Sequence, residues 1–445
     1  MTKKVLLIAY YFPPSGGAGV QRTLKFVKYL QEFGWQPVVL TVQNADYPAV
    51  DESLLAEIPQ DTPVYRSKIA EPYAIYRRLT GQKNGPTDIA VLSRDPDQQL
   101  SLREKFSEWI RAAFFVPDAR IGWLPFAASL GKKIIAREQI DLIYSSAPPY
   151  TAHLIAGMLH RRTGLPWVAD FRDSWIGWLS APQWRPLPSR AVEKWMERGV
   201  LRDATRVLAV SAGVREDLLS RHPHLRDGRW HILTNGYDSA DFDRPSTPKS
   251  DHLTLLYAGS LYGHRDPEAL IAAMEELDRQ TPQLAERLRL RFIGRIAPIF
   301  QQRINSSPIR RFCEILPYLS HGESIAYLKA SDVALLIIDD APANRGILTG
   351  KLFEYIGAGK PILALAPEGD AADLIRSHNF GLVVPLGDTR RVFDVLRDFA
   401  ARWPQPPLPP LAADKIRPFE RRTLTEKLAT IFTEAISNPQ KSVAE

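Results

Sequence analysis

The stretch ILTGKLFEYIGAGKPILAL, residues 347–365, decides the fold of this 445-residue chain. It predicts a loop, a helix from Lys351 to about Ala358, a stop made of Gly, Lys and Pro, and then a buried strand. The apolar run Val333–Ile338 comes before it and predicts another strand. Strand, loop, helix and strand in this order form the unit from which parallel sheets are built. The chain is therefore predicted to be an α/β protein.

The start of this helix suits an anionic ligand. Free N–H groups and the helix dipole both point outward from a helix N-terminus, so negative charge is stabilised there. Thr349, Gly350 and Lys351 stand at this point and suit a phosphate, and Glu354 follows one turn later, where it could hold a sugar hydroxyl. An ordinary helix start with a solvated lysine and glutamate is the alternative.

Composition excludes several classes of protein. Hydrophobic residues at 45% and charged residues at 24% are typical of a soluble globular protein. The single cysteine, Cys313, excludes an intramolecular disulfide framework and a cysteine-rich zinc site. The apolar run after the first lysines is too short for a signal peptide and fits a buried first strand. No stretch reaches the ~18–20 apolar residues of a membrane span, so we expect a cytoplasmic protein.

The net charge of +7 and the pI near 9.3 favour an anionic partner. Basic runs with interleaved aromatic residues and zinc-finger spacing are missing from the sequence, so nucleic acid is not expected as a partner. Basic residues instead recur in two amphipathic stretches, residues 101–115 and 190–206. Mixed-charge helices of this kind are most often solvated faces. Peripheral contact with an anionic membrane, on its cytoplasmic face, is the second interpretation.

Apolar runs and helical patterns alternate along the chain in two series, which indicates parallel strands joined by helices. The first series of predicted strands is Val5–Tyr10, Gln36–Thr41, Leu142–Ser145, Trp167–Asp170, Arg206–Val210 and His231–Leu233. The second series is Leu253–Ala258, Leu290–Ile293, Cys313–Leu316, Val333–Ile338, Pro361–Ala364 and Gly381–Val384. We therefore predict two Rossmann-like, doubly wound parallel-sheet domains, residues 1–240 and 250–402, that face a central cleft.

Two regions depart from the alternation. Residues 43–101, approximately, are rich in prolines and charges and predict an irregular excursion from the first domain. Residues 403–445 contain a Pro-rich passage and a terminal helix from about Arg417 to Ile436, which we expect to pack back on the first domain.

A glycine-rich loop, SGGAG, follows the first predicted strand and opens a helix. Gly16 and Gly17 have no side chain, so the backbone can approach a ligand closely there. A nicotinamide dinucleotide site is a poor match, because the spacing is not G-x-G-x-x-G and the second strand does not end in an acidic residue.

The segment 347–365 closely resembles the donor-sugar site of family-4-like retaining glycosyltransferases, which have two Rossmann-like domains and are called GT-B enzymes. The glycine loop followed by V-Q-R-x-x-K-x-x-x-x-L resembles the opening of many of them, and D-F-R-D-x-W at 170–175 lies in a segment that resembles one subgroup. In this resemblance Glu354 matches the second of two glutamates and binds the nucleotide ribose. The first glutamate is absent, since Ile347 stands near its place.

Acidic residues mark the end of the predicted strand Trp167–Asp170. Ionised groups at such a position cost desolvation free energy unless they are paired or used. The resemblance implies that Asp170 or Asp173 acts on the acceptor hydroxyl as a base or an orienting group, and the sequence does not choose between them. A structural ion pair with Arg172 is the alternative.

The resemblance also implies cations beside the donor diphosphate. Arg265, Arg295 and Lys351 are the candidates, and each follows a predicted strand of the second domain. Fixed positive charge stabilises a departing diphosphate without a metal ion. No D-x-D motif ends a strand and the histidines lack zinc spacing, so we expect no metal and no cofactor besides the nucleoside-diphosphate sugar, which is the donor substrate.

The resemblance implies a glycosyltransferase that moves a sugar from this donor to an acceptor hydroxyl with retention. The implied acceptor is a saccharide, lipid-linked, of bacterial cell-envelope polysaccharide biosynthesis. A nucleotide-sugar epimerase of the same fold and a non-catalytic nucleotide-sugar-binding protein stay open as alternatives, and a dehydrogenase is a distant third.

Overall fold

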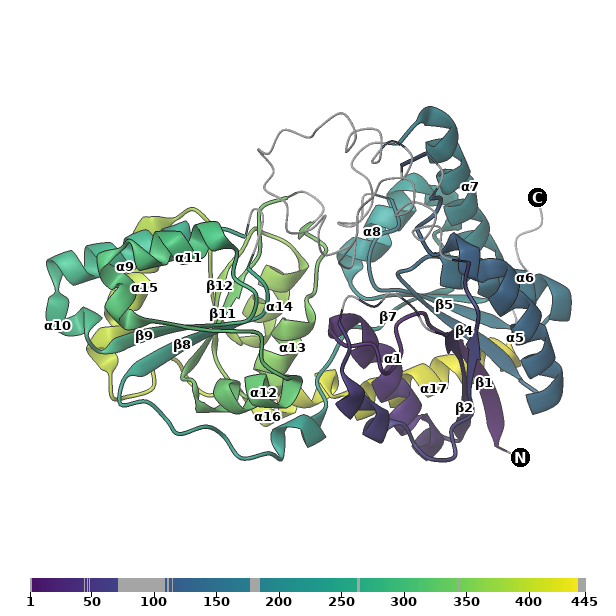
Figure 1. The fold of residues 1–445 in the computed structure, drawn as a ribbon, viewed down its shortest axis with the longest axis horizontal. Coiled ribbons are helices and arrows are strands. Elements are labelled where there is room, and N and C mark those ends of the chain that lie inside the picture. Colours follow the sequence, from purple (N-terminus) through teal and green to yellow (C-terminus); the bar gives the residue numbers. More distant parts are fainter. Residues whose placement is uncertain are drawn as a thin grey trace. The chain divides into compact units, whose positions relative to one another are not determined.

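The computed structural model describes residues 2–43, 45, 47, 49–70, 109, 112–113, 115–176, 185–261, 265–341 and 344–438. These residues form two compact units (Figure 1). The first unit holds the described residues up to Thr234 together with those from Arg421 onward, and the second unit runs from Asn235 to Glu420. Among the described residues, the chain passes from the first unit to the second after Thr234 and returns to the first unit at Arg421.

The first unit is built on a seven-stranded sheet in the order β3-β2-β1-β4-β5-β6-β7. Every neighbouring pair in it is parallel. Its strands are β1 (Lys3–Ile8), β2 (Trp35–Val42), β3 (Val64–Ser67), β4 (Leu142–Ala147), β5 (Trp167–Phe171), β6 (Arg206–Ala209) and β7 (Trp230–Ile232). The chain winds outward from β1 in one direction and from β4 in the other, so all seven carboxyl ends share one edge.

Strand β3 lies inside the region predicted to be irregular, so that part of the prediction was wrong. Val64 aligns with Val39 of β2, and η2 (Glu52–Glu57), a short 3₁₀-helix, precedes the strand. The four residues VYRS bury only Ser67, which leaves little apolar pattern to detect. Residues 71–101 of the predicted excursion lie outside the described residues.

Helices cover both faces of the first sheet (Figure 1). One core contains Val5 and Leu7 of β1, and the other contains Leu6 and Ile8, as the two-residue period of a strand requires. The first core includes side chains of α1 (Ala18–Tyr29) and α17 (Arg421–Ser437). The second includes side chains of α5 (Leu124–Glu138), α6 (Thr151–Thr163), α7 (Leu187–Asp203) and α8 (Ala212–Arg221).

The last helix, α17, supplies part of the core of the first unit. Phe432 is fully buried, and its ring meets the rings of Trp35 and Tyr144 edge-on, with centroid separations of 5.2 and 5.7 Å. Leu424 and Leu428 are buried in the same cluster. Figure 1 shows α17 beside α1 on this side of the sheet.

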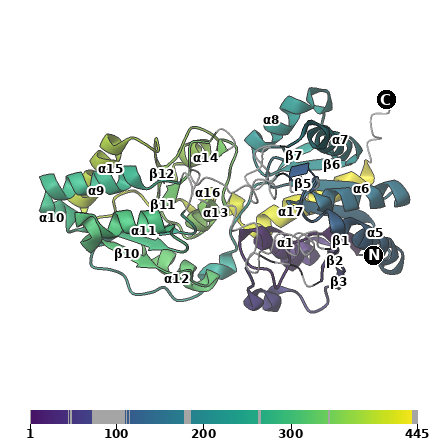
Figure 2. The same cartoon turned by 45° about the horizontal axis from the view of Figure 1, so that its top comes forward.

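The second unit is built on a six-stranded parallel sheet in the order β10-β9-β8-β11-β12-β13 (Figure 2). Its strands are β8 (Leu253–Ala258), β9 (Leu288–Ile293), β10 (Cys313–Leu316), β11 (Val333–Ile337), β12 (Ile362–Leu365) and β13 (Gly381–Val384). One face packs on α9 (Glu268–Gln280), α11 (Pro298–Asn305) and α15 (Thr389–Arg402). The other face packs on α12 (His321–Ala330), α13 (Gly350–Gly357) and α14 (Asp370–His378).

Short helices complete the two units. They are η1 (Leu30–Phe33), η3 (Ile121–Trp123), η4 (Pro223–Leu225), η5 (Ser239–Phe242), α10 (Pro282–Ala285), η6 (Pro308–Phe312), α16 (Ala413–Ile416) and η8 (Arg417–Phe419). Every predicted strand is present, with ends displaced by two residues or fewer. The predicted α/β fold with two parallel sheets is confirmed, and the cleft between them stays a prediction.

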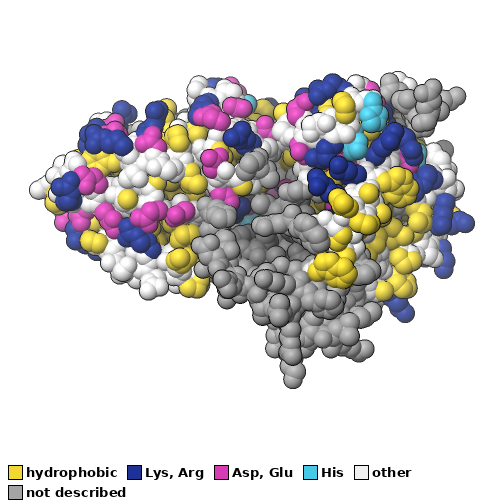
Figure 3. All heavy atoms as spheres, turned by 90° about the horizontal axis from the view of Figure 1, so that it is seen from above, with side chains coloured by type: hydrophobic (Ala, Val, Ile, Leu, Met, Phe, Trp, Pro, Cys, Tyr) yellow, Lys and Arg dark blue, Asp and Glu magenta, His cyan; other side chains and the backbone are white. Residues whose placement is uncertain are grey.

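Large apolar side chains are exposed on the first unit. Trp195 and Leu187 of α7 are 73% and 81% exposed. Figure 3 shows hydrophobic side chains gathered beside lysine and arginine side chains on this unit. In the described part of the chain, no helix has the length and apolar character needed to cross a membrane.

Candidate functional site

The three cations predicted from the sequence follow three neighbouring strands of the second sheet. Arg265 lies between β8 and α9, Arg295 is the second residue after β9, and Lys351 lies in the first turn of α13, which follows β11. Strands β9, β8 and β11 are adjacent and parallel, so their carboxyl ends lie at one edge. The structure therefore places all three cations at the same edge of the sheet.

Lys351 crosses the end of β8. Its Nζ donates to the Tyr257 hydroxyl at 3.0 Å and lies 4.4 Å from the centre of that ring, a favourable position for a cation. A Cβ atom added to Gly259 would lie 2.0 Å from Lys351 Cε. Gly259, with φ at 133°, is therefore what gives the lysine side chain its room.

The end of β9 repeats this arrangement. Gly294 has φ at 129°, and a Cβ atom there would lie 2.4 Å from the carbonyl oxygen of Gly259. The two strand ends thus approach each other without side chains between them. Arg295 comes next, is exposed, and holds its guanidinium 5.4 Å from the ring centre of Tyr318.

Helix α13 starts with a polar group that has no partner among the described residues. Thr349 is the N-cap residue, but its side chain does not cap the helix. Its Oγ1 is buried and has no hydrogen-bond partner within the described part of the chain. The first turn contains no acidic residue. A phosphate oxygen at this point would meet the Thr349 hydroxyl, the helix N-terminus and Lys351 together.

Tyr355 fixes α13 on the sheet. Its hydroxyl donates to the carbonyl oxygen of Leu335 at 3.2 Å and accepts from the N–H of Ala258 at 3.1 Å. Burial raises the pKa of Tyr355, so the phenol stays neutral and can serve both partners. The helix that carries Lys351 and Glu354 is thereby held against β8 and β11.

Glu354 lies near a histidine that the sequence analysis missed. Glu354 Oε1 is 3.8 Å from Nδ1 of His321, the first residue of α12, and Nε2 of this histidine is 3.1 Å from Asp241 Oδ2. His321 stands between two acids that are distant in sequence. The only local signal was the capping box of Ser320 and Glu323, which predicts a helix start and no ligand.

In the first unit, the glycine loop after β1 forms the N-terminus of α1. The Gly16 N–H donates to the carbonyl oxygen of Ala49 at 2.8 Å. Gly17 is the N-cap residue with φ at 86°, and a Cβ atom there would meet nothing within 4 Å. The loop therefore leaves the backbone open at Gly17, beside a helix N-terminus, and the role of Gly16 and Gly17 in ligand binding stays a prediction.

Asp170 has the contacts of a structural ion pair. The carboxylate is fully buried and accepts two hydrogen bonds of 2.8 Å from Arg22, one at each oxygen, and further ones from Tyr144 and Ser146. Burial alone would raise the pKa of Asp170, but the charge and hydrogen bonds of Arg22 outweigh it and lower the pKa. An inaccessible carboxylate that holds its charge is a poor base, so the structural alternative describes Asp170 better.

The structural alternative paired one of these acids with Arg172, but Asp170 pairs with Arg22. Arg172 donates to main-chain carbonyls instead: to Gly19 at 2.5 Å, Pro148 at 2.6 Å and Ala147 at 3.2 Å. Arg172, just after β5, is thus bound to the first turn of α1 and to the end of β4. Asp173 lies two residues beyond β5 and is half-buried, and its carbonyl oxygen accepts from the Tyr150 hydroxyl at 3.0 Å. Asp173 is the carboxylate of this loop that stays a catalytic candidate.

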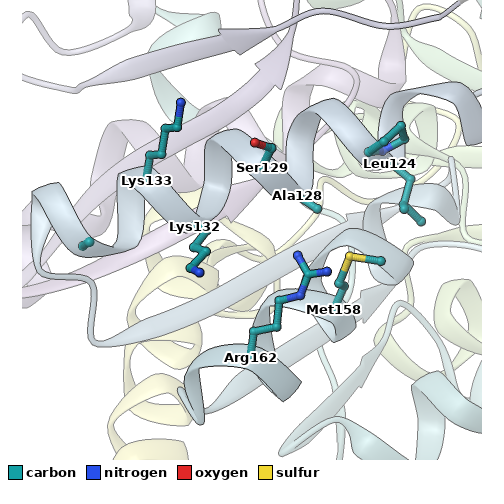
Figure 4. Close-up of a pocket in the computed structure, with 9 residues that line it drawn as sticks. Leu124, Ala128, Ser129, Lys132, Lys133, Met158 and Arg162 are labelled. Atoms are coloured by element: carbon teal, nitrogen blue, oxygen red, sulfur yellow. The ribbon is translucent and has the colours of Figure 1, made fainter.

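A separate groove lies between α5 and α6, with a volume of about 660 Å³. Figure 4 shows Lys132 of α5 and Arg162 of α6 extending toward the space between the two helices, near Met158. None of the site residues predicted from the sequence lines this groove.

Comparisons with known proteins bear on both units. The family described as Glycosyltransferase Family 4 matches residues 73–241. The alpha-maltose-1-phosphate synthase of Mycolicibacterium smegmatis is 37% identical over 68 residues, which are 15% of this chain and 17% of that protein. A glycosyltransferase from Rickettsia africae shares the fold with a TM-score of 0.64 at 15% identity, over 98% of this chain and 99% of that one.

The family match confirms the resemblance to family-4 glycosyltransferases over residues 73–241, which are less than half of the chain. A trehalose-6-phosphate protein from E. coli, bound with UDP-2-fluoro glucose, also shares the GT-B fold, with a TM-score of 0.58 at 12% identity over 100% of both chains. At such identities the structures establish the fold. The family match supports a glycosyltransferase and does not favour the epimerase alternative.

Proposed function

We propose that this protein transfers a sugar from a nucleoside-diphosphate sugar to a hydroxyl of an acceptor saccharide. The bond between the anomeric carbon and the diphosphate oxygen breaks, the acceptor oxygen takes its place, and the acceptor proton leaves to a base. The family resemblance favours retention of configuration and an acceptor that is lipid-linked, in bacterial cell-envelope polysaccharide biosynthesis. The E. coli relative bound to a UDP-sugar supports the class of donor.

One observation carries the proposal: Lys351 and the unsatisfied Thr349 hydroxyl meet at the N-terminus of α13, beside the glycine ends of β8 and β9. A diphosphate there would receive hydrogen bonds from a neutral hydroxyl and a charged ammonium, and Arg265 and Arg295 follow the same strand ends. These groups gain interaction energy as the diphosphate acquires charge on leaving, which is the condition for catalysis by differential binding.

Glu354 and His321 are assigned to the donor sugar or its ribose. The carboxylate of Glu354 accepts hydrogen bonds from hydroxyl groups, and His321 orients it from the side of Asp241. Asp173, at the carboxyl edge of the first sheet, is assigned to the acceptor hydroxyl. The loop of Gly16 and Gly17, whose backbone is open at Gly17, is assigned to a ligand that approaches the same edge.

Donor binding tests the assignment first. Titration calorimetry with UDP-, GDP-, ADP- and dTDP-sugars identifies the nucleoside. We expect Lys351→Ala to weaken binding of that donor about tenfold or more, because hydrogen bonds to charged groups contribute about 1.5–3 kcal/mol. Lys249→Ala removes an exposed lysine from the same unit and is the matched control. Equal donor affinity in wild type and Lys351→Ala would show that the donor does not bind at the N-terminus of α13.

Product analysis tests the reaction. Transfer to an acceptor saccharide supports the proposal, whereas conversion of the nucleotide sugar without acceptor would identify an epimerase. Tight donor binding with no turnover across an acceptor panel would identify a binding protein. Asp173→Asn is expected to lower turnover by a larger factor than donor affinity.

A further inference from the structure

The loop that follows β5 contains Asp173, and its main chain is bound to the start of α6. The hydroxyl of Tyr150, the N-cap residue of α6, donates to the carbonyl oxygens of Asp173 at 3.0 Å and Ser174 at 2.7 Å. The ring of Trp175 stacks on the ring of Tyr150, with their centres 4.6 Å apart and their planes 17° from parallel. Three consecutive residues of the loop therefore contact one side chain.

The side chain of Ser174 binds a different element, helix α8. Its hydroxyl donates to Oδ2 of Asp217 and accepts from Nη2 of Arg221 at 3.1 Å. Nη1 of Arg221 donates to the same oxygen of Asp217 at 2.7 Å. The hydroxyl, the carboxylate and the guanidinium thus form a closed ring of hydrogen bonds. Ser174 is fixed both at its main chain and at its side chain.

Arg221 is itself held by a buried carboxylate of α7. Glu197 is fully buried and accepts from Nε and Nη2 of Arg221 at 2.9 and 3.0 Å. Nε2 of His222 lies 2.9 Å from the same carboxylate. A buried carboxylate without a counter-charge is strongly destabilising, so Arg221 cannot turn away from Glu197. The position of the Ser174 hydroxyl is therefore set by the interior of the first unit.

This network ends directly beside the carboxylate assigned to the acceptor hydroxyl. Asp173 is half-buried and lies outside β5, so the strand alone does not fix its side chain. A group that acts on a reacting hydroxyl must be held in a narrow range of positions, and a misplacement of about 1 Å can cost up to about a hundredfold in rate. The bonds on both sides of the loop supply this restraint.

We propose that Ser174 is a positioning residue for Asp173. Its hydroxyl, held by Asp217 and Arg221, fixes the loop so that the carboxylate of Asp173 meets the acceptor hydroxyl. Ser174 does not touch the reacting atoms and acts only through its neighbour. The inference rests on the proposed sugar transfer and on the role assigned to Asp173 in it.

Kinetics of the full chain, with the donor and acceptor that calorimetry and product analysis identify, test the proposal. Ser174→Ala is expected to lower kcat for transfer about tenfold and to leave the donor Kd unchanged, because the donor site lies in the second unit. Ser174→Thr keeps the hydroxyl and is expected to retain most of the turnover. Ser220→Ala is the matched control: this exposed serine of α8 donates to the carbonyl oxygen of Asp217 at 2.7 Å and does not contact the loop, so turnover should stay near that of wild type.

A double-mutant cycle separates positioning from a general structural effect. The double variant Asp173→Asn, Ser174→Ala is expected to have the turnover of Asp173→Asn alone, because Ser174 acts through a carboxylate that is already gone. Two independent effects would multiply instead. Thermal unfolding of Ser174→Ala should stay close to that of wild type, since Arg221 keeps its bonds to Asp217 and Glu197.

The outcomes distinguish this inference from the proposed function. If Asp173→Asn lowers turnover and Ser174→Ala does not, or if the two effects multiply, the positioning role of Ser174 is overturned while the transfer reaction stands. If Asp173→Asn keeps the turnover of wild type, or if no acceptor receives the sugar, the role of Asp173 fails first and the inference falls with it. A tenfold loss in Ser174→Ala that disappears in the Asp173→Asn background supports both.

Discussion

A single buried pair, Arg22 and Asp170, ties the glycine-loop helix to the centre of the first sheet. Arg22 also donates to the carbonyl oxygens of Leu233 and Thr234, the last residues before the chain enters the second unit. We expect Asp170→Asn to lower the free energy of unfolding by about 3–5 kcal/mol, since it leaves a buried guanidinium without its counter-charge. Urea denaturation measures this.

Two controls separate pairing from packing at this site. Arg279→Gln removes an exposed ion pair with Glu276 and should leave the free energy of unfolding nearly unchanged. The double variant Arg22→Met, Asp170→Leu removes both charges and should recover part of the loss. If Asp170→Asn retains full stability but loses turnover, then Asp170 is a catalytic residue after all.

Glu193 makes stability depend on pH. Burial raises the pKa of this carboxyl from its ordinary value to about 7, against the opposing effect of Arg185. Between pH 4.5 and 7 the folded protein therefore holds a proton that the unfolded chain has released, so stability falls as pH rises through this window. The contribution is up to about 3 kcal/mol. Glu193→Gln should flatten the profile over this range in chemical denaturation; an unchanged slope would contradict the assignment.

The positions of Lys351, Arg265 and Arg295 after strand ends were predictable from the sequence. The side chains that contact the candidate site residues were not. The sequence offered Arg172 to Asp170 because they are two residues apart, but Arg22, 148 residues away, holds it. Local spacing cannot reveal a contact that only the strand order β1-β4-β5 creates. The same holds for His321 and Glu354.

At the scale of elements, the glycine ends of β8 and β9 offer a matched pair of substitutions. Both residues have φ near 130°, so alanine strains the backbone similarly at each. Gly259→Ala would displace the flexible end of Lys351, whereas Gly294→Ala would meet the main chain of Gly259. We expect the first to weaken donor binding about as much as Lys351→Ala does, and the second to lower the unfolding midpoint further. Calorimetry with donor and thermal unfolding distinguish them.

The reverse pattern, with Gly294→Ala harmless to stability and Gly259→Ala neutral for donor binding, would contradict this account of the strand ends.

Elements with a strong apolar period were predicted from the sequence, and α13 is the clearest, expected from Lys351 and found from Gly350. Strand β3 was not, because a four-residue edge strand is stabilised by its pairing with β2 and carries little pattern of its own.

At the scale of the molecule, the first unit is assembled from both ends of the chain. We expect Phe432→Ala in α17 to lower the free energy of unfolding of this unit by about 3–5 kcal/mol, because it removes the ring that meets Trp35 and Tyr144. Phe126→Ala is the control, since Phe126 is 41% exposed on α5. Equal effects of the two variants in urea denaturation would show that α17 is dispensable to the core.

The return of the chain at Arg421 sets an order of events on the ribosome. Every residue of the second unit is synthesised before α17 emerges, so the nascent chain can finish its second unit while the first still exposes the apolar surface that Phe432 and Leu428 later cover. The first unit begins to be synthesised first but is completed last. We expect a chain that ends before α17 to contain a folded second unit and a first unit whose core is incomplete.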